Sequence, residues 1–186
     1  MRTKRERRRA RIARVVACGL LVVMCAGPGL AQDVANGQAT ANVLAGLTIV
    51  ATQDLQFGDI LQGVAKSVGY DDDLNAGIFT ITGNTGSGIS VYITLPDYIA
   101  LTDGSDRMTI SFTTTDCAVD QNGATPSTVT ALDGFIDQDP HNLPGGIVVG
   151  VPNTRLYLGG RVTPTIDQAP GAYFGDVICS VAYNGT

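Results

Sequence analysis

The stretch GISVYITL, residues 88–95, decides the fold class of this chain. Its side chains alternate in character: Ile89, Val91, Ile93 and Leu95 take one parity, and Ser90, Tyr92 and Thr94 take the other. A period of two buries one side of a β-strand and leaves the other side in water. The stretch therefore predicts a strand of an antiparallel sheet that packs on a core by one face.

The same alternation recurs elsewhere. In residues 107–115 the alternation predicts that Met108, Ile110 and Phe112 point inward and that Thr109, Ser111 and Thr113 point outward. Near the C-terminus the residues that share one face are Val177, Cys179, Val181 and Tyr183. Shorter strands are expected at residues 54–60, 76–82, 127–132, 146–151 and 155–163. Loops are expected at residues 69–75, 116–126 and 138–145, where turn-forming residues gather.

Composition favours the same fold class. After residue 31 the chain has one Lys and no Glu, while Asp, Gly, Thr and Pro are plentiful, so helices lack their usual surface residues. Strands separated by turn residues, with no helical period between them, predict an all-β fold, namely a two-sheet antiparallel sandwich. A closed β-barrel is the alternative.

The N-terminus has the pattern of an export signal. Residues 1–14 hold eight basic residues and one acid, Glu6, and the apolar run 15–26 follows and ends at Gly27-Pro28. Gly29 and Ala31 are small residues placed for cleavage before Gln32. We therefore expect a signal peptide at residues 1–31, a flexible mature N-terminus at 32–38 and a β-sandwich domain at 39–184. The run is shorter than the ~20 residues of a spanning helix, so no stable membrane anchor is expected.

Loss of this segment changes the charge of the chain. The whole chain has 12 basic and 17 acidic residues and a net charge of −5. Removing eight basic residues and one acid leaves 4 − 16 = −12. Such a surface repels phosphate backbones, so nucleic acid is not an expected partner. The predicted location is the periplasm, the cell surface or the medium of a bacterium.

The first stretch of the predicted domain is apolar on both parities. In residues 39–51, Val43, Leu47 and Ile49 take one parity and Leu44 and Val50 take the other. This pattern suits a strand with both faces covered. Such a strand either pairs within its own sheet or adds to an exposed edge in the next molecule, where it would act as an assembly strand.

No catalytic arrangement is evident in the sequence. The single histidine, His141, stands in a Pro-flanked polar loop, and no nucleophile-elbow sequence occurs. Carboxylate pairs that could hydrolyse a glycoside occur at Asp71–Asp73 and at Asp137 with Asp139. The chain after residue 31 has no Glu and no Trp, however, and these are the residues common in sugar clefts. The expectation is a protein that is not an enzyme and that has no cofactor.

Two sets of residues are candidates for binding or crosslinking. Weak calcium candidates are Asp116, Asp120 and Asn122 in one loop and Asp137 and Asp139 in the next, although neither spacing matches an Asp-x-Asp-x-Asp-Gly loop, and a solvated acidic rim is the alternative. Cys117 and Cys179 are the cysteines that remain after cleavage, and in an oxidising compartment they predict a disulfide, with two separately buried thiols as the alternative.

Several stretches resemble a known group of proteins. Residues 41–49 and 54–60 are similar to the opening, and residues 159–162, 169–177 and 181–184 to the closing hairpin, of a bacterial family of secreted domains of unknown function. That family is similar in turn to spore coat protein U and to chaperone-usher fimbrial subunits. The resemblance spans residues 39–184. It implies an immunoglobulin-like sandwich completed by a neighbour's strand, and hence a structural or adhesive surface role with self-association into fibres. A monomeric extracellular module that binds glycan or calcium is the alternative.

Overall fold

The computed structural model describes residues 38–43 and 45–185. The predicted signal peptide, nearly all of the predicted flexible segment, and Leu44 lie outside these residues. Within the described part of the chain no helix is long and apolar enough to cross a membrane.

The described residues form an all-β domain, as predicted. Its strands are β1 (Thr48–Gln53), β2 (Lys66–Val68), β3 (Gly77–Thr82), β4 (Ile89–Thr94), β5 (Tyr98–Leu101), β6 (Arg107–Ser111), β7 (Cys117–Asp120), β8 (Gly134–Gln138), β9 (Thr154–Leu158), β10 (Gly160–Thr163), β11 (Tyr173–Phe174) and β12 (Ile178–Tyr183). The one helix described is the 3-10 turn η2 (Pro126–Thr128).

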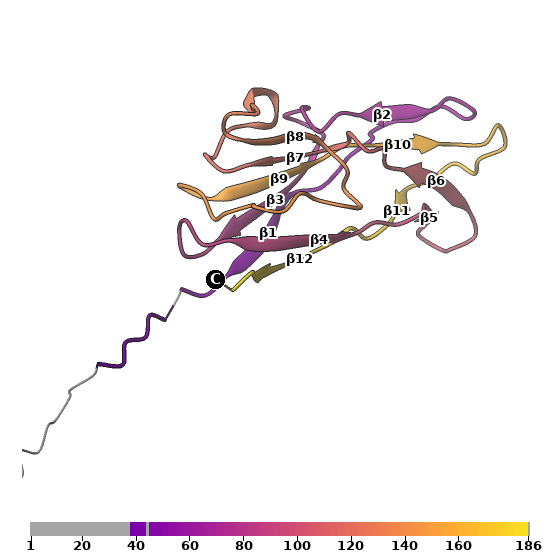
Figure 1. Cartoon of the computed structure of the whole chain (residues 1–186). Helices are drawn as coiled ribbons and strands as arrows, with labels where there is room; N and C mark the ends of the chain where they lie inside the picture. The colour runs from indigo at the N-terminus through magenta and orange to yellow at the C-terminus, as the bar shows by residue number, and fades with distance from the viewer. Residues whose placement is uncertain (1–37, 44, 186) are drawn as a thin grey trace, which may run out of the picture. The chain divides into compact units, whose positions relative to one another are not determined.

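The strands form three antiparallel groups. The first sheet has the order β1-β3-β9-β7-β8, the second has the order β11-β5-β6-β10-β2, and β12 pairs with β4. In Figure 1 the first sheet forms one layer, the β4–β12 pair is drawn below it, and the second sheet is at the right of the view. This arrangement confirms the predicted antiparallel sandwich.

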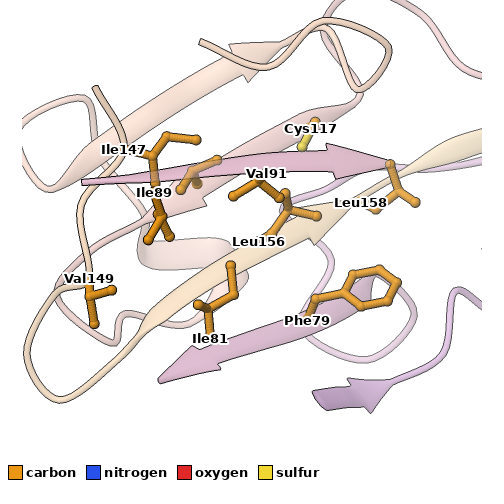
Figure 2. Close-up of a cluster of buried hydrophobic side chains, with 10 residues drawn as sticks. Phe79, Ile81, Ile89, Val91, Cys117, Ile147, Val149, Leu156 and Leu158 are labelled. Atoms are coloured by element: carbon orange, nitrogen blue, oxygen red, sulfur yellow. The ribbon is translucent and has the colours of Figure 1, made fainter. Parts of the chain in front are cut away.

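The main core lies between the first sheet and the β4–β12 pair. Figure 2 shows Ile81 on β3 and Leu156 on β9 near Ile89 and Val91 of β4. Ile147 and Val149, from the chain before β9, close one end of this cluster. A second, smaller cluster has Met108, Ile110 and Val162 at its centre, on β6 and β10 of the second sheet. Burying these apolar side chains is the main term that stabilises the domain.

The alternating patterns are confirmed where one face of a strand meets solvent. On β6, Met108 and Ile110 are buried while Thr109 and Ser111 are exposed. On β4, Ile89 and Val91 are buried and Tyr92 is exposed. On β12 the odd-numbered residues face the core, as predicted.

Three of the predicted strands are wrong. Residues 54–60 have no strand, and the left-handed backbone of Gly58, with φ of 60°, interrupts their alternation. Residues 127–132 hold the end of η2 and a turn, and the strand comes later, as β8. In residues 146–151 only Val148 makes a bridge, to Gly88. The structure also contains the short strands β2, β5 and β11, which the alternation did not predict.

The predicted loop 116–126 contains a central strand. β7 pairs with both β8 and β9, and all four of its residues are buried. Because both faces of β7 are covered, its residues do not alternate between apolar and polar, and the prediction missed it.

The predicted first strand is corrected in length and in burial. β1 starts at Thr48 rather than at residue 39, and it pairs within its own molecule with β3. Leu47 and Ile49 pack against the core, whereas Val50 is 58% exposed and Val43, ahead of the strand, is 92% exposed. β1 is thus an edge strand with one covered face.

The Thr154 hydroxyl at the start of β9 should contribute to the stability of the domain. Its fully buried hydroxyl donates to the Val148 carbonyl at 2.8 Å and accepts from the Gly150 N–H at 2.8 Å. Thr154→Val keeps the shape but leaves both groups unpaired, and the free energy of unfolding should fall by about 2–4 kcal/mol. Urea denaturation measures this loss. Thr154→Ser keeps the hydroxyl, so its free energy of unfolding should fall clearly less. Equal losses of unfolding free energy in the two variants would contradict the prediction.

Candidate functional site

A cavity of about 1140 Å³ opens between the first and second sheets. One wall is formed by the end of β1 and residues 54–60, and the other by residues 168–177, which include β11. Between the walls lie buried apolar side chains, Phe79 and Leu158 from the first sheet and Met108 and Ile110 from the second. Nearer the surface, Phe57 and Val177 are partly exposed and Phe174 is 65% exposed, so the lining leaves apolar contact area open.

Each wall of the cavity carries an edge strand. β1 pairs only with β3, and β11 pairs only with β5. Among the described strands, each therefore has one edge without a ladder partner. Backbone N–H and C=O groups on such an edge can pair with an added strand.

The first wall is tied to the loop before β3. The Gln53 side chain donates to the Ala76 carbonyl at 2.8 Å, and the Gln56 N–H donates to the Asn75 carbonyl at 2.9 Å. Gly77 lets Leu55 approach closely, because a Cβ at Gly77 would lie 3.3 Å from the Leu55 Cβ. These contacts hold residues 54–56, which follow β1, in place without strand pairing.

The second wall is held by a polar network around Asp106. The Gln168 amide, which is 3% exposed, donates to the Asp106 carboxylate at 2.6 Å. The Tyr173 hydroxyl and the Ala169 N–H donate to the same oxygen, each at 2.8 Å. These donors, first the Ala169 N–H and then the Tyr173 hydroxyl, lower the pKa of Asp106. The ionised carboxylate thus fixes residues 168–173 against the start of β6.

Acid should weaken this wall. Because the folded-state pKa of Asp106 lies below its usual value of 3.8, the carboxylate stabilises the fold above that pH. The contribution is lost as the pH falls through the lower, folded value. Thermal melts should therefore show a stable protein from pH 7 to 5 and a falling melting temperature below about pH 4. The Asp106→Asn variant should have a lower melting temperature at pH 7, and acidification should lower that temperature by less than it does in the unchanged protein. An acid response equal to that of the unchanged protein would contradict this.

The charged groups of the cavity are acidic. Its lining includes Asp54, Asp59 and Asp176, and no Lys or Arg is among the lining residues. An acidic rim disfavours an acidic occupant and accepts an uncharged one.

The structure separates the calcium candidates into two groups at opposite ends of β7. Asp116 directly precedes β7, and Asp137 and Asp139 flank Gln138, which pairs with Cys117 at that end. Asp120 and Asn122 lie at the other end. No three His, Cys, Asp or Glu side chains gather as metal ligands in the described part of the chain.

The three candidates at the Cys117 end of β7 already have hydrogen-bond donors. Asp116 accepts from the Thr113 N–H at 2.6 Å, and Asp137 accepts from the Tyr70 hydroxyl at 3.0 Å. Asp139 accepts from the backbone and the ring of His141, which lowers the pKa of that carboxyl. These contacts give each side chain a structural role.

Cys117 and Cys179 are free thiols in the structure, so the predicted disulfide is not formed there. Both residues belong to or pack on the main core cluster, and Cys117 appears in Figure 2 among its aliphatic neighbours. Burial raises the pKa of the Cys117 thiol above its ordinary value, and the nearby Cys179 raises it further. Burial likewise raises the pKa of Cys179, to about 11.

The sequence did not point to the cavity or to the Asp106 network. Gln168 and Tyr173 follow no spacing rule relative to Asp106, and residues 54–60 were predicted as a strand. The Gly and Pro residues of segment 168–177 indicate a loop but do not reveal what it contacts. The comparisons add no relative: no protein-family model matches the chain, and no curated protein matches its sequence.

Proposed function

We propose that this protein is a secreted, non-enzymatic structural or adhesive subunit of the cell surface, and that copies assemble by strand addition. The observation that carries the proposal is the open cavity, flanked by the edge strands β1 and β11. The resemblance of residues 39–184 to a family of secreted domains of unknown function, which is similar in turn to fimbrial subunits, points the same way.

The donor in this proposal is the segment ahead of β1 in the next molecule. Residues 39–45, ATANVLA, are uncharged and include Val43 and Leu44. Val43 is 92% exposed, so its own domain does not cover it. Fully extended, residues 39–45 reach about 23 Å, the length of an ordinary strand.

The acceptor is the cavity. A donor strand would pair its backbone with the free edge of β1 or β11 and place alternate side chains against partly exposed lining residues such as Phe57, Ile99 and Val177. An uncharged segment suits the acidic rim. Because the mature chain has a net charge of −12, assembly should also strengthen with added salt, which screens the repulsion between copies.

Deleting the donor tests the proposal. The mature protein should elute from size exclusion as oligomers or fibres that resist mild denaturant, and deletion of residues 32–44 should give monomers. The deletion stops before Ala45 because the Ala45 carbonyl accepts from the Tyr183 hydroxyl at 2.9 Å. Deletion of residues 32–38, which keeps the apolar segment, is the matched control. A monomeric mature protein, or unchanged oligomers after the longer deletion, would refute assembly by this strand.

Export also predicts the state of the two core cysteines. In an oxidising compartment we expect a thiol–disulfide oxidase to join Cys117 and Cys179, since both contact one core cluster. Alkylation of the exported protein, denatured without reductant, should label neither cysteine, whereas the same protein made in a reducing cytoplasm should label both. Two labelled thiols in the exported protein would mean that the core keeps them separate.

A further inference from the structure

Asp120 is an unusual residue at the end of β7, because it is a carboxylate with no exposure to solvent. One oxygen, Oδ2, accepts from the Asn122 N–H at 3.2 Å and from the Ala124 N–H at 2.8 Å. The other oxygen, Oδ1, is buried without a donor. A buried ionisable oxygen without a partner is costly, so it needs a positive or donating neighbour.

A second buried oxygen without a donor lies against the same loop. Asn153 directly precedes β9, the neighbour of β7, and its Oδ1 also has no partner. A Cβ on Gly123 would lie 3.8 Å from this Oδ1, so Asn153 contacts the loop that folds over Asp120. The two orphaned acceptors therefore border one short loop, residues 121–124.

The charges around the loop leave room for a cation. Arg155 pairs across the sheet with Asp120, but its guanidinium donates to the Ala124 carbonyl, and the Asp120 carboxylate forms no ion pair within the described residues. Asp133, which accepts from the Asn122 side chain at 2.6 Å, adds a second carboxylate beside the loop. Two carboxylates and one guanidinium sum to −1. A hollow of about 440 Å³ lies beside the loop and is lined in part by Gln121, Asn122 and Asp133.

We infer that the loop at residues 120–124 binds a hard divalent cation of the calcium type through Asp120 Oδ1 and Asn153 Oδ1. Oxygen ligands from a carboxylate, an amide and water are those that calcium prefers. With one direct carboxylate the affinity belongs in the range of extracellular modules, about 10⁻⁴–10⁻³ M. The ion would link β7 to the start of β9. This site is separate from the proposed assembly cavity.

Calcium titration of the folded protein tests the inference. At constant ionic strength, 5 mM calcium chloride should raise the melting temperature by about 3 °C, since a ligand that binds only the native state stabilises it. Asp120→Asn should abolish the rise. This variant should fold, because the oxygen of the new amide can still accept from the Asn122 and Ala124 N–H groups. Asp97→Asn, at an exposed carboxylate in a different turn, is the matched control and should keep the full rise.

Terbium luminescence provides a second measurement on the same variants. The Tyr157 hydroxyl donates to the Ala124 carbonyl, so its ring is close enough to excite a lanthanide at the loop. Terbium should give a sensitised signal that calcium displaces, and Asp120→Asn should lose most of it. The inference is overturned if calcium leaves the melting temperature unchanged, or if Asp120→Asn responds as fully as Asp97→Asn. Either result would mean that water alone occupies the two oxygens.

Discussion

Two variants that cannot polymerise alone should form a 1:1 dimer when they are mixed. The first variant lacks residues 32–44, so it keeps an open cavity but has no donor segment. The second carries Ala51→Trp and Ala172→Trp, two exposed positions that line opposite walls of the cavity, so it keeps the donor but has no free acceptor. Each should be monomeric. Mixed, the donor of the second variant can enter the cavity of the first, and growth stops there because no further acceptor remains.

The controls separate strand addition from general stickiness. Ala182→Trp places the same bulky side chain at an exposed position of β12 that does not line the cavity, and this variant should polymerise like the unchanged protein. Native mass spectrometry of the mixture should give one 1:1 species, and its amount should rise with salt. A dimer that also forms from the donor-deleted variant alone would show that a different surface associates.

The sequence predicted the strands whose two faces have different surroundings. β4, β6 and β12 each face a core on one side and solvent on the other, so hydrophobic burial acts on every second residue. β7 gave no such signal, because all four of its residues are buried and both of its faces are covered. The short apolar run Cys117–Val119 between two aspartates was the only sign of it.

The candidate site could not be predicted in the same way. Its walls, residues 54–60 and 168–177, are far apart in the sequence and lie around one cavity only because the first and second sheets come together in the fold. Asp106 stands in a turn rich in aspartate and serine, and nothing local shows that its carboxylate collects donors from the distant Gln168 and Tyr173. Asp120 was identified as a calcium candidate by residue type, but its complete burial depends on the central position of β7.

Truncating Leu156 should cause the largest loss of stability from a single core substitution. Leu156 is fully buried on β9 and pairs with Phe79 on β3 and with Val119 on β7, so strands on both sides restrain it. Neighbours held in this way cannot collapse into the space that Leu156→Ala leaves, and the free energy of unfolding should fall by about 3–5 kcal/mol. The total free energy of unfolding of a domain of this size is about 5–15 kcal/mol, so this loss is a large part of it. The urea midpoint should therefore fall far below that of the unchanged protein, while the dependence of the unfolding free energy on urea keeps the same slope. Leu132→Ala, the same truncation at a side chain that is 97% exposed, should change the free energy of unfolding by no more than about 0.5 kcal/mol. Similar losses in the two variants would mean that Leu156 is not at the centre of the core. The placement of β9 between β3 and β7 would then be wrong as well.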